Sequence, residues 1–165
     1  MNKPKEAGLI LAIDQASNAA GVSLWEDGNL KATTVLLSAS PKDPFGKRLV
    51  TQVKQLTAFL DHEIGDRKLN VLLFEGVKSS MVLSTVGAFV TCPHLQNCKF
   101  TPKNSFISAL SWKKYARDRG ATQKFKEIKG VRALREIGFP VDAHNITSDD
   151  IADSCLIYLC WRSRA

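Results

Sequence analysis

Short apolar runs in the first part of the chain predict three consecutive strands. Residues 9–13 read Leu-Ile-Leu-Ala-Ile, a continuous run that is typical of a strand buried on both faces. Residues 21–25 and 31–37 predict a second and a third strand, and the Asp27-Gly28 dipeptide between them is a hairpin signal. We therefore expect the fold to open with an antiparallel meander.

A helical period replaces this pattern after residue 44. Apolar residues recur there at steps of three and four, which predicts an amphipathic helix of about five turns. These residues are Phe45, Leu49, Val53, Leu56, Leu60 and Ile64. Gly65 is expected to end the helix, and residues 71–74 predict a fourth, buried strand that leads directly into Glu75.

The second half of the chain gives weaker patterns. Residues 82–90 predict a helix, residues 99–101 a short strand, and residues 124–137 a helix, whereas residues 111–130 form a basic, irregular stretch. A last helix is expected from about Thr147 to about Arg162. Strands first, followed by strand–helix alternation, predict an α/β fold in which helices flank a mixed five-stranded sheet. We expect a single domain over residues 1–165.

Composition narrows the class of protein and its partners. Of 165 residues, 44% are hydrophobic, as in an ordinary folded domain, and the formal net charge is +7. A compact basic domain favours a polyanionic partner, with nucleic acid the first candidate, although a surplus that only aids solubility is the alternative. No apolar run approaches the ~20 residues of a membrane span, and the apolar run near the N-terminus is too short for a signal peptide. We therefore expect a cytoplasmic protein with four reduced cysteines.

Carboxylates at the ends of predicted elements carry the candidate chemistry. Asp14 follows the first apolar strand and Glu75 the fourth, while Asp149, Asp150 and Asp153 crowd the start of the last helix. An unpaired charge at the end of a buried strand is costly unless a cation or solvent faces it. Carboxylates converging from two strands and a helix would form an oxygen-rich site that suits Mg²⁺ or Mn²⁺.

The helix acids also have a purely structural interpretation. Thr147 to Asp150 fits a capping box with Thr147 as the capping residue, and acids in a first turn favour the helix dipole. Asp150 and Asp153 are three residues apart and share one helical face, which favours them over Asp149 as site residues. Asp149 is therefore expected to be structural.

The ordered motifs resemble those of the RuvC-type Holliday junction resolvases, in the RNase H-like superfamily. Residues 11–14 read Leu-Ala-Ile-Asp, residues 73–75 Leu-Phe-Glu, and residues 150–153 Asp-Ile-Ala-Asp. The resemblance covers nearly the whole chain in length and element order. One departure lies three residues after Glu75, where bacterial members carry a stacking aromatic residue and this chain has Lys78. That departure suits a phage-type member.

The resemblance implies an activity and a set of site residues. It implies a magnesium- or manganese-dependent endonuclease that resolves four-way DNA junctions as a homodimer, in DNA recombination and repair. The catalytic and metal-binding carboxylates would be Asp14, Glu75, Asp150 and Asp153, and two ions would be held per site with Asp14 bridging them. The resemblance also implies basic residues on the phosphates, carried over to Lys113 and Lys124. The other basic residues expected to bind DNA come from the charge of the chain itself: Lys78, Lys114, Arg117 and Lys126.

Two alternatives for the function remain open at this point. The chain could be another RNase H-like nuclease, either a ribonuclease H or a less selective branched-DNA endonuclease, or a non-catalytic module that binds nucleic acid. A separate zinc site at Cys92, His94 and Cys98 is also conceivable, but the spacing is not that of a standard knuckle. Cys155 and Cys160 are expected in the core, and His62 at the surface.

Overall fold

The computed structural model describes residues 8–15, 18–38, 40–76, 87–96, 98–99 and 105–164. A five-stranded sheet forms its centre, with strands in the order β3-β2-β1-β4-β5. The strands are β1 (Leu9–Asp14), β2 (Ala19–Glu26), β3 (Asn29–Leu37), β4 (Val71–Gly76) and β5 (Phe106–Ser108). The first three are antiparallel, whereas β4 pairs with β1 and β5 pairs with β4 in parallel. The predicted mixed five-stranded α/β fold is confirmed.

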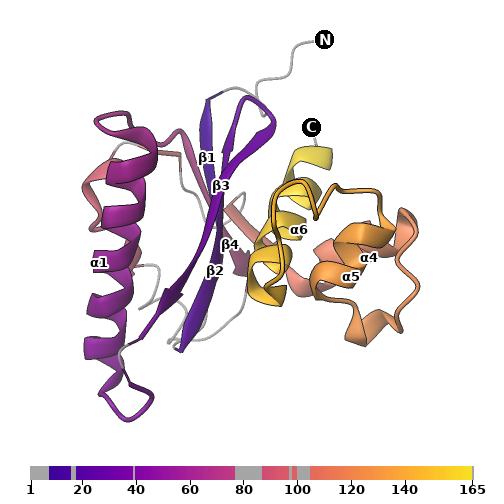
Figure 1. Ribbon diagram of the computed structural model, residues 1–165, viewed down its shortest axis with the longest axis horizontal. Coiled ribbons are helices and arrows are strands. Elements are labelled where there is room, and N and C mark those ends of the chain that lie inside the picture. The colour runs from indigo at the N-terminus through magenta and orange to yellow at the C-terminus, as the bar shows by residue number, and fades with distance from the viewer. Residues whose placement is uncertain are drawn as a thin grey trace.

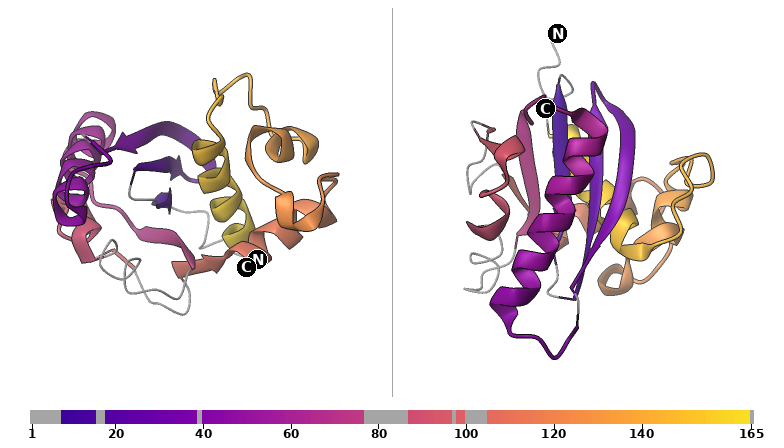
Figure 2. Two further views of the ribbon diagram at one scale, coloured as in Figure 1. Left: turned by 90° about the horizontal axis from the view of Figure 1, so that it is seen from below. Right: turned by 60° about the vertical axis from the view of Figure 1, so that its left-hand side comes forward.

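The central strand β1 is buried on both faces of the sheet. Successive side chains of a strand point to opposite faces. Ile10 and Ala12 belong to one apolar core, and Leu9, Leu11 and Ile13 belong to a second core on the other side. Two helical layers therefore cover the sheet, as Figures 1 and 2 show.

Helix α1 (Phe45–Ile64) covers the face of the second core. Its bounds agree with those predicted from the apolar period, and Gly65 follows with a φ of 58°, a backbone conformation that favours glycine. The helix also reaches the free edge of the sheet. The side-chain amide of Gln55 donates to the Leu37 carbonyl at 2.6 Å, and its oxygen accepts from the Leu37 N–H at 2.7 Å.

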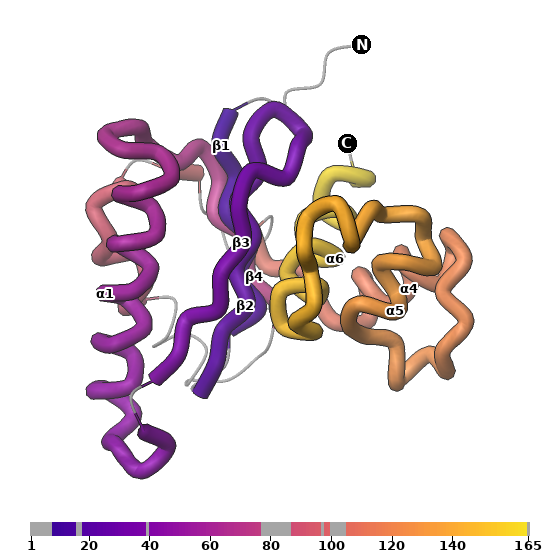
Figure 3. Tube along the Cα trace, viewed as in Figure 1, coloured from indigo at the N-terminus to yellow at the C-terminus, as the bar shows by residue number. Residues whose placement is uncertain are grey.

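Helix α6 (Asp149–Ser163) covers the other face and is itself covered. Its residues from Ser154 to Trp161 are all buried, because α4 (Ala109–Asp118) and α5 (Gly130–Glu136) lie on the side of α6 away from the sheet (Figures 1 and 3). Tyr158 stacks on Trp25 of β2 with ring centroids 3.9 Å apart. The Trp25 indole donates to the Ser23 hydroxyl at 2.9 Å. In the described part of the chain, no helix is both long and apolar enough to cross a membrane.

Several local predictions in the second half are wrong. Of the strand expected over residues 99–101, Lys99 makes an isolated bridge with Val71 and residues 100–101 lie outside the described residues, whereas the fifth strand of the sheet is Phe106–Ser108. The basic stretch contains α4, and the helix expected over residues 124–137 is interrupted between the short 3₁₀ helix η3 (Phe125–Glu127) and α5. Gly130 causes the interruption: it has a φ of 78°, and a Cβ there would clash with the Asp149 side chain.

Two further predictions concern the helix expected over residues 82–90 and the residue that caps α6. Within the helix predicted over residues 82–90, residues 87–89 are helical and residues 82–86 lie outside the described residues. A second 3₁₀ helix, η2 (Pro93–Leu95), follows. The capping residue of α6 is Ser148 rather than Thr147, since the Ser148 hydroxyl accepts from the Ile151 N–H at 3.3 Å. The capping signal was one residue out of register.

A close approach at Gly21 gives the first prediction. A Cβ at Gly21 would collide with the backbone of Asp150 at the start of α6, so Gly21→Ala should push the helix from the sheet. We expect the free energy of unfolding to fall by about 1–3 kcal/mol in urea titrations. The matched control is Gly46→Ala, which adds the same methyl group to α1 in open space and should be neutral or slightly stabilising. Equal stability of both variants would contradict the close contact.

Candidate active site

Strand alternation places Asp14 and Glu75 on the same face of the sheet. Asp14 follows Ile10 and Ala12 at even spacing, and Glu75 follows Leu73 in the same way. All three of those apolar residues belong to the core beneath α6. Strands β1 and β4 run in parallel with Ile13 opposite Phe74, so the two acids end neighbouring strands. Both carboxylates therefore lie on the side of the sheet covered by α6.

Helix α6 brings its own acids to this edge. Asp149 and Asp150 lie in its first turn, and Asp153 lies one turn further on. Gly21, the β2 partner of Asp14 across the antiparallel ladder, is in direct contact with the Asp150 backbone. Because no side chain separates β2 from the helix at this point, the start of α6 lies against the end of β1.

The pKa values of Asp14 and Asp153 are raised, and neighbouring acids contribute to both shifts. Burial raises the pKa of Asp14 from its ordinary 3.8 to about 8, and the repulsion of neighbouring carboxylates adds to the shift. Those neighbours, from the largest effect to the smallest, are Glu75, Asp153 and Asp150. Burial likewise raises the pKa of Asp153 to about 7, against a lowering effect of the Gly130 N–H. The four predicted site carboxylates thus form one electrostatic group.

Hydrogen bonds hold several of these acids in place. The Trp112 indole N–H donates to Oε2 of Glu75 at 2.9 Å, and the Gly130 N–H donates to Oδ1 of Asp153 at 2.6 Å. Asp149 is exposed and accepts from the Val131 N–H at 3.0 Å, which is a structural role at the start of α5. Sequence reasoning missed Trp112 and Gly130. A tryptophan in a stretch without clear periodicity was the available signal, since a buried indole N–H needs an acceptor.

The donor set fits a hard divalent cation. It consists of carboxylate oxygens, the ligands that Mg²⁺ and Mn²⁺ prefer. Among the residues that the structure describes, no three His, Cys, Asp or Glu side chains are already arranged to hold an ion. Burial, together with the neighbouring carboxylates, raises the pKa values of Asp14 and Asp153, and a bound cation would offset the cost of ionising them.

Some of the predicted DNA-binding side chains already have partners within the protein, and others are exposed to solvent. Lys113 donates to the Lys126 carbonyl at 2.9 Å, and Lys114 pairs with Asp118 at 2.8 Å, so both ammonium groups already have partners. The remaining described members of the set are exposed: Arg117, Lys124 and Lys126. Lys78 lies outside the described residues.

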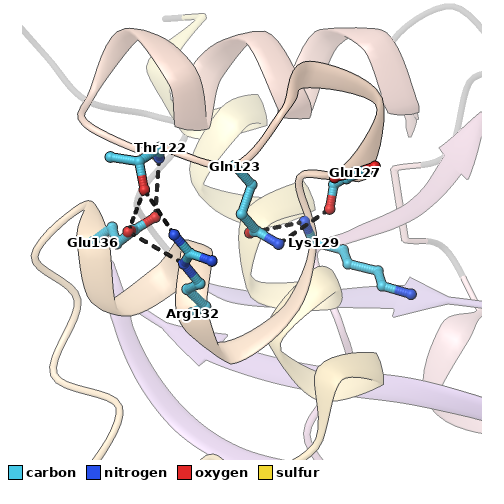
Figure 4. A network of polar contacts seen from close by, with 6 residues as sticks. All are labelled: Thr122, Gln123, Glu127, Lys129, Arg132 and Glu136. Atoms are coloured by element: carbon cyan, nitrogen blue, oxygen red, sulfur yellow. Dashed lines mark hydrogen bonds and ion pairs between the residues drawn. The ribbon is translucent and has the colours of Figure 1, made fainter.

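A polar network supports the segment that carries Lys124 and Lys126 (Figure 4). The Glu136 carboxylate accepts from the Thr122 N–H at 3.0 Å and from the Thr122 hydroxyl at 2.6 Å, and it pairs with Arg132 at 3.4 Å. The Thr122 hydrogen bonds lower the pKa of Glu136. Gln123 donates to the Glu127 carbonyl at 3.2 Å. These contacts fix both ends of the loop between α4 and α5.

The cysteine and histidine candidates have other roles in the fold. Nε2 of His94 lies 2.6 Å from Asp61 Oδ1, and Nδ1 lies 3.2 Å from the Arg67 carbonyl, so both ring nitrogens already have partners. Cys92 is buried beside Thr57 in the core beneath α1. The arrangement favours packing over a zinc site. Cys155 and Cys160 are buried and His62 is exposed, as predicted.

Comparison with known proteins gives matches at the level of structure. No protein-family model and no curated protein matches this sequence. RuvC from Thermus thermophilus matches with a TM-score of 0.62 and 14% identity, over 94% of this chain and 95% of that chain. T. thermophilus RuvC in complex with Holliday junction substrate matches with a TM-score of 0.62 and 13% identity, over 95% of each chain. The chain therefore has the RuvC-type fold that its motifs predict.

The raised pKa of Asp14 yields a prediction for the metal-free protein. The unfolded carboxyl titrates near 3.8 and the folded one near 8, so the folded state binds more protons between these values and loses stability as pH rises through that window. Asp14→Asn removes the titrating group. In EDTA, we expect the variant to exceed the wild type in stability by on the order of 2–5 kcal/mol at pH 8.5 and to differ little at pH 4. Chemical unfolding at both pH values measures this, and equal stabilities at pH 8.5 would show that neither burial nor the neighbouring acids raise the pKa of Asp14 in this way.

Proposed function

We propose that this chain, with its RuvC-type fold, is a metal-dependent DNA endonuclease that resolves four-way junctions by phosphodiester hydrolysis. The observation that carries the proposal is the electrostatic grouping of Asp14, Glu75, Asp150 and Asp153 at one edge of the sheet. Acids gathered from two strands and a helix destabilise the metal-free fold, and a cation would offset that cost.

These carboxylates would hold two divalent ions. Such ions, when bound, polarise the phosphate and activate the attacking water. Asp14 would be the shared ligand, because β1 lies between β4, which carries Glu75, and β2, which touches the start of α6 at Gly21. The Gly130 N–H orients Asp153, and the core beneath α6 fixes the strand ends that carry Asp14 and Glu75. The protein thus supplies positioning and compensation of charge.

Basic residues of the loop between α4 and α5 are proposed to bind the phosphates. Lys124 and Lys126 are exposed there, and the same loop leads into Gly130, which contacts Asp153. The exposed Arg117 on α4 completes the proposed surface. A homodimer is part of the proposal, because symmetric cleavage of a junction needs two active sites related by a twofold axis.

The choice of junction DNA over other substrates draws on the comparison. A solved neighbour covering 95% of this chain is RuvC bound to a Holliday junction substrate, which supports junction DNA over an RNA–DNA hybrid. Retention of all four acids favours an enzyme over a non-catalytic binding module. A less selective branched-DNA nuclease is the main competitor, and it would cleave a three-way junction as readily as a four-way junction.

Cleavage of a synthetic four-way junction tests the proposal. Mg²⁺ should support symmetric nicking of the junction, in preference to a plain duplex and an RNA–DNA hybrid, and EDTA should abolish it. We expect Asp14→Asn, Glu75→Gln, Asp150→Asn and Asp153→Asn each to reduce turnover by roughly 100-fold or more while junction binding persists. Asp149→Asn is the matched control and should retain most activity, because the Asp149 carboxylate is exposed and accepts the Val131 N–H at the start of α5. Cleavage in EDTA, or an active Asp14→Asn variant, would contradict the proposed chemistry.

Salt dependence of binding tests the proposed phosphate surface. Changing Lys124 and Lys126 together to Ala should reduce the slope of log affinity against log salt by up to about two units, since each phosphate neutralised contributes roughly 0.9. The matched control changes Lys47 and Lys54, two exposed lysines of α1 on the opposite face of the sheet. That control should leave the slope unchanged. Equal slopes for wild type and the Lys124/Lys126 variant, in fluorescence anisotropy titrations, would mean that DNA binds elsewhere.

A further inference from the structure

We propose that Trp112 is a positioning residue that fixes the Glu75 carboxylate for divalent-metal binding. The inference rests on the proposed function and assigns a role in it to Trp112, whose side chain packs in the core. The observation behind it is one hydrogen bond, from the Trp112 indole N–H to Oε2 of Glu75, at 2.9 Å.

The burial of Trp112 favours this hydrogen bond. Trp112 is 2% exposed, so little bulk water can replace a protein acceptor for its N–H. Within the described part of the chain, Glu75 is the acceptor that it has. Loss of the carboxylate contact would leave a buried donor unpaired, which ties the orientation of the indole to that of Glu75.

The fold determines where the indole lies. Strand β5 pairs with the end of β4, with Glu75 opposite Ile107 and Gly76 opposite Ser108. Ser108 caps α4 through a hydrogen bond from the Ser111 N–H, at 3.1 Å. Trp112 comes one turn after this cap, so the first turn of α4 carries it back over the end of β4.

Core packing then holds the ring itself. Trp112 belongs to the apolar core shared by the sheet, α4, α5 and α6. The ammonium group of Lys113 lies 5.7 Å from the centre of the ring and is itself held by the Lys126 carbonyl. A donor fixed in this way limits the rotation of a glutamate side chain more firmly than a loop residue or a water molecule does.

The contact restrains the carboxylate without neutralising it. An indole N–H is a neutral donor, whereas a lysine or arginine in its place would cancel the charge that attracts a cation. It occupies Oε2, and Oε1 makes no hydrogen bond or ion pair with the residues described here. Glu75 is thereby held with one oxygen available as a metal ligand. Its side chain is already ordered in the folded protein, so metal binding does not have to bear that loss of entropy.

Titration of Mn²⁺ into the metal-free protein, followed by electron paramagnetic resonance of the unbound ion, tests the proposal without an activity assay. We expect Trp112→Phe, which keeps an apolar ring and loses the donor, to weaken Mn²⁺ affinity by about 10- to 100-fold. The matched control is Trp25→Phe: Trp25 is 1% exposed and also donates to a side chain, but its acceptor is Ser23. That variant should bind Mn²⁺ within about twofold of the wild type, at a similar cost in stability.

A shape-preserving replacement covers the case in which Trp112→Phe fails to fold. Site-specific incorporation of benzothienylalanine at position 112 replaces the N–H by sulfur and keeps the bicyclic ring. It should reproduce the loss of Mn²⁺ affinity. In addition, the indole proton resonance of Trp112, assigned by its disappearance in Trp112→Phe, should shift on addition of Mg²⁺ to the wild type and in metal-free Glu75→Gln.

The outcomes separate this inference from the proposed function. If the wild type binds Mn²⁺ and both the benzothienylalanine protein and Trp112→Phe bind it equally well, the positioning role is wrong and the nuclease proposal stands. If the wild type binds no Mn²⁺, or Glu75→Gln binds it unchanged, the proposed metal site fails and the inference fails with it. Weakened binding in both Trp112 proteins, with Trp25→Phe unaffected, supports the inference.

Discussion

The packing of α6 directly on the sheet is the contact on which the rest of the structure depends. At Gly21 the backbone of β2 touches the backbone of Asp150, with no side chain between them. Further along the helix, Tyr158 stacks on Trp25 and the residues from Ser154 to Trp161 are buried. Because α6 lies this close, acids at its start share a partly buried space with Asp14 and Glu75. The same packing that forms the core thus creates the charge repulsion at its edge.

The parts of the fold set by local periodicity were predictable from sequence. The apolar run at residues 9–13 predicted β1, and the three-four spacing from Phe45 to Ile64 predicted α1 with its observed bounds. The convergence of the acids followed as well, since strand ends and a helix start are where a chain presents charged side chains to a cleft. These features depend on residue type and spacing alone.

Features that depend on tertiary contacts were missed. Helix α4 is rich in basic residues and buries only Trp112 and Ala116, so its sequence shows no clear hydrophobic periodicity. The break before α5 depends on the approach of Asp149 to Gly130, which no local pattern reveals. The partners of Lys113 and Lys114 were equally hidden, because a sequence does not tell an ammonium group held by a neighbouring carbonyl or carboxylate from one directed at solvent.

The double hydrogen bond between Gln55 and Leu37 has a consequence for how copies of this protein behave in a crowded solution. Strand β3 lies at the border of the sheet, where exposed backbone groups are a template for another chain. At Leu37 the amide of Gln55 satisfies both the N–H and the carbonyl, as a neighbouring strand would. A strand added at Leu37, the last residue of β3, would first have to displace Gln55, so α1 protects this end of the edge strand from pairing with another chain.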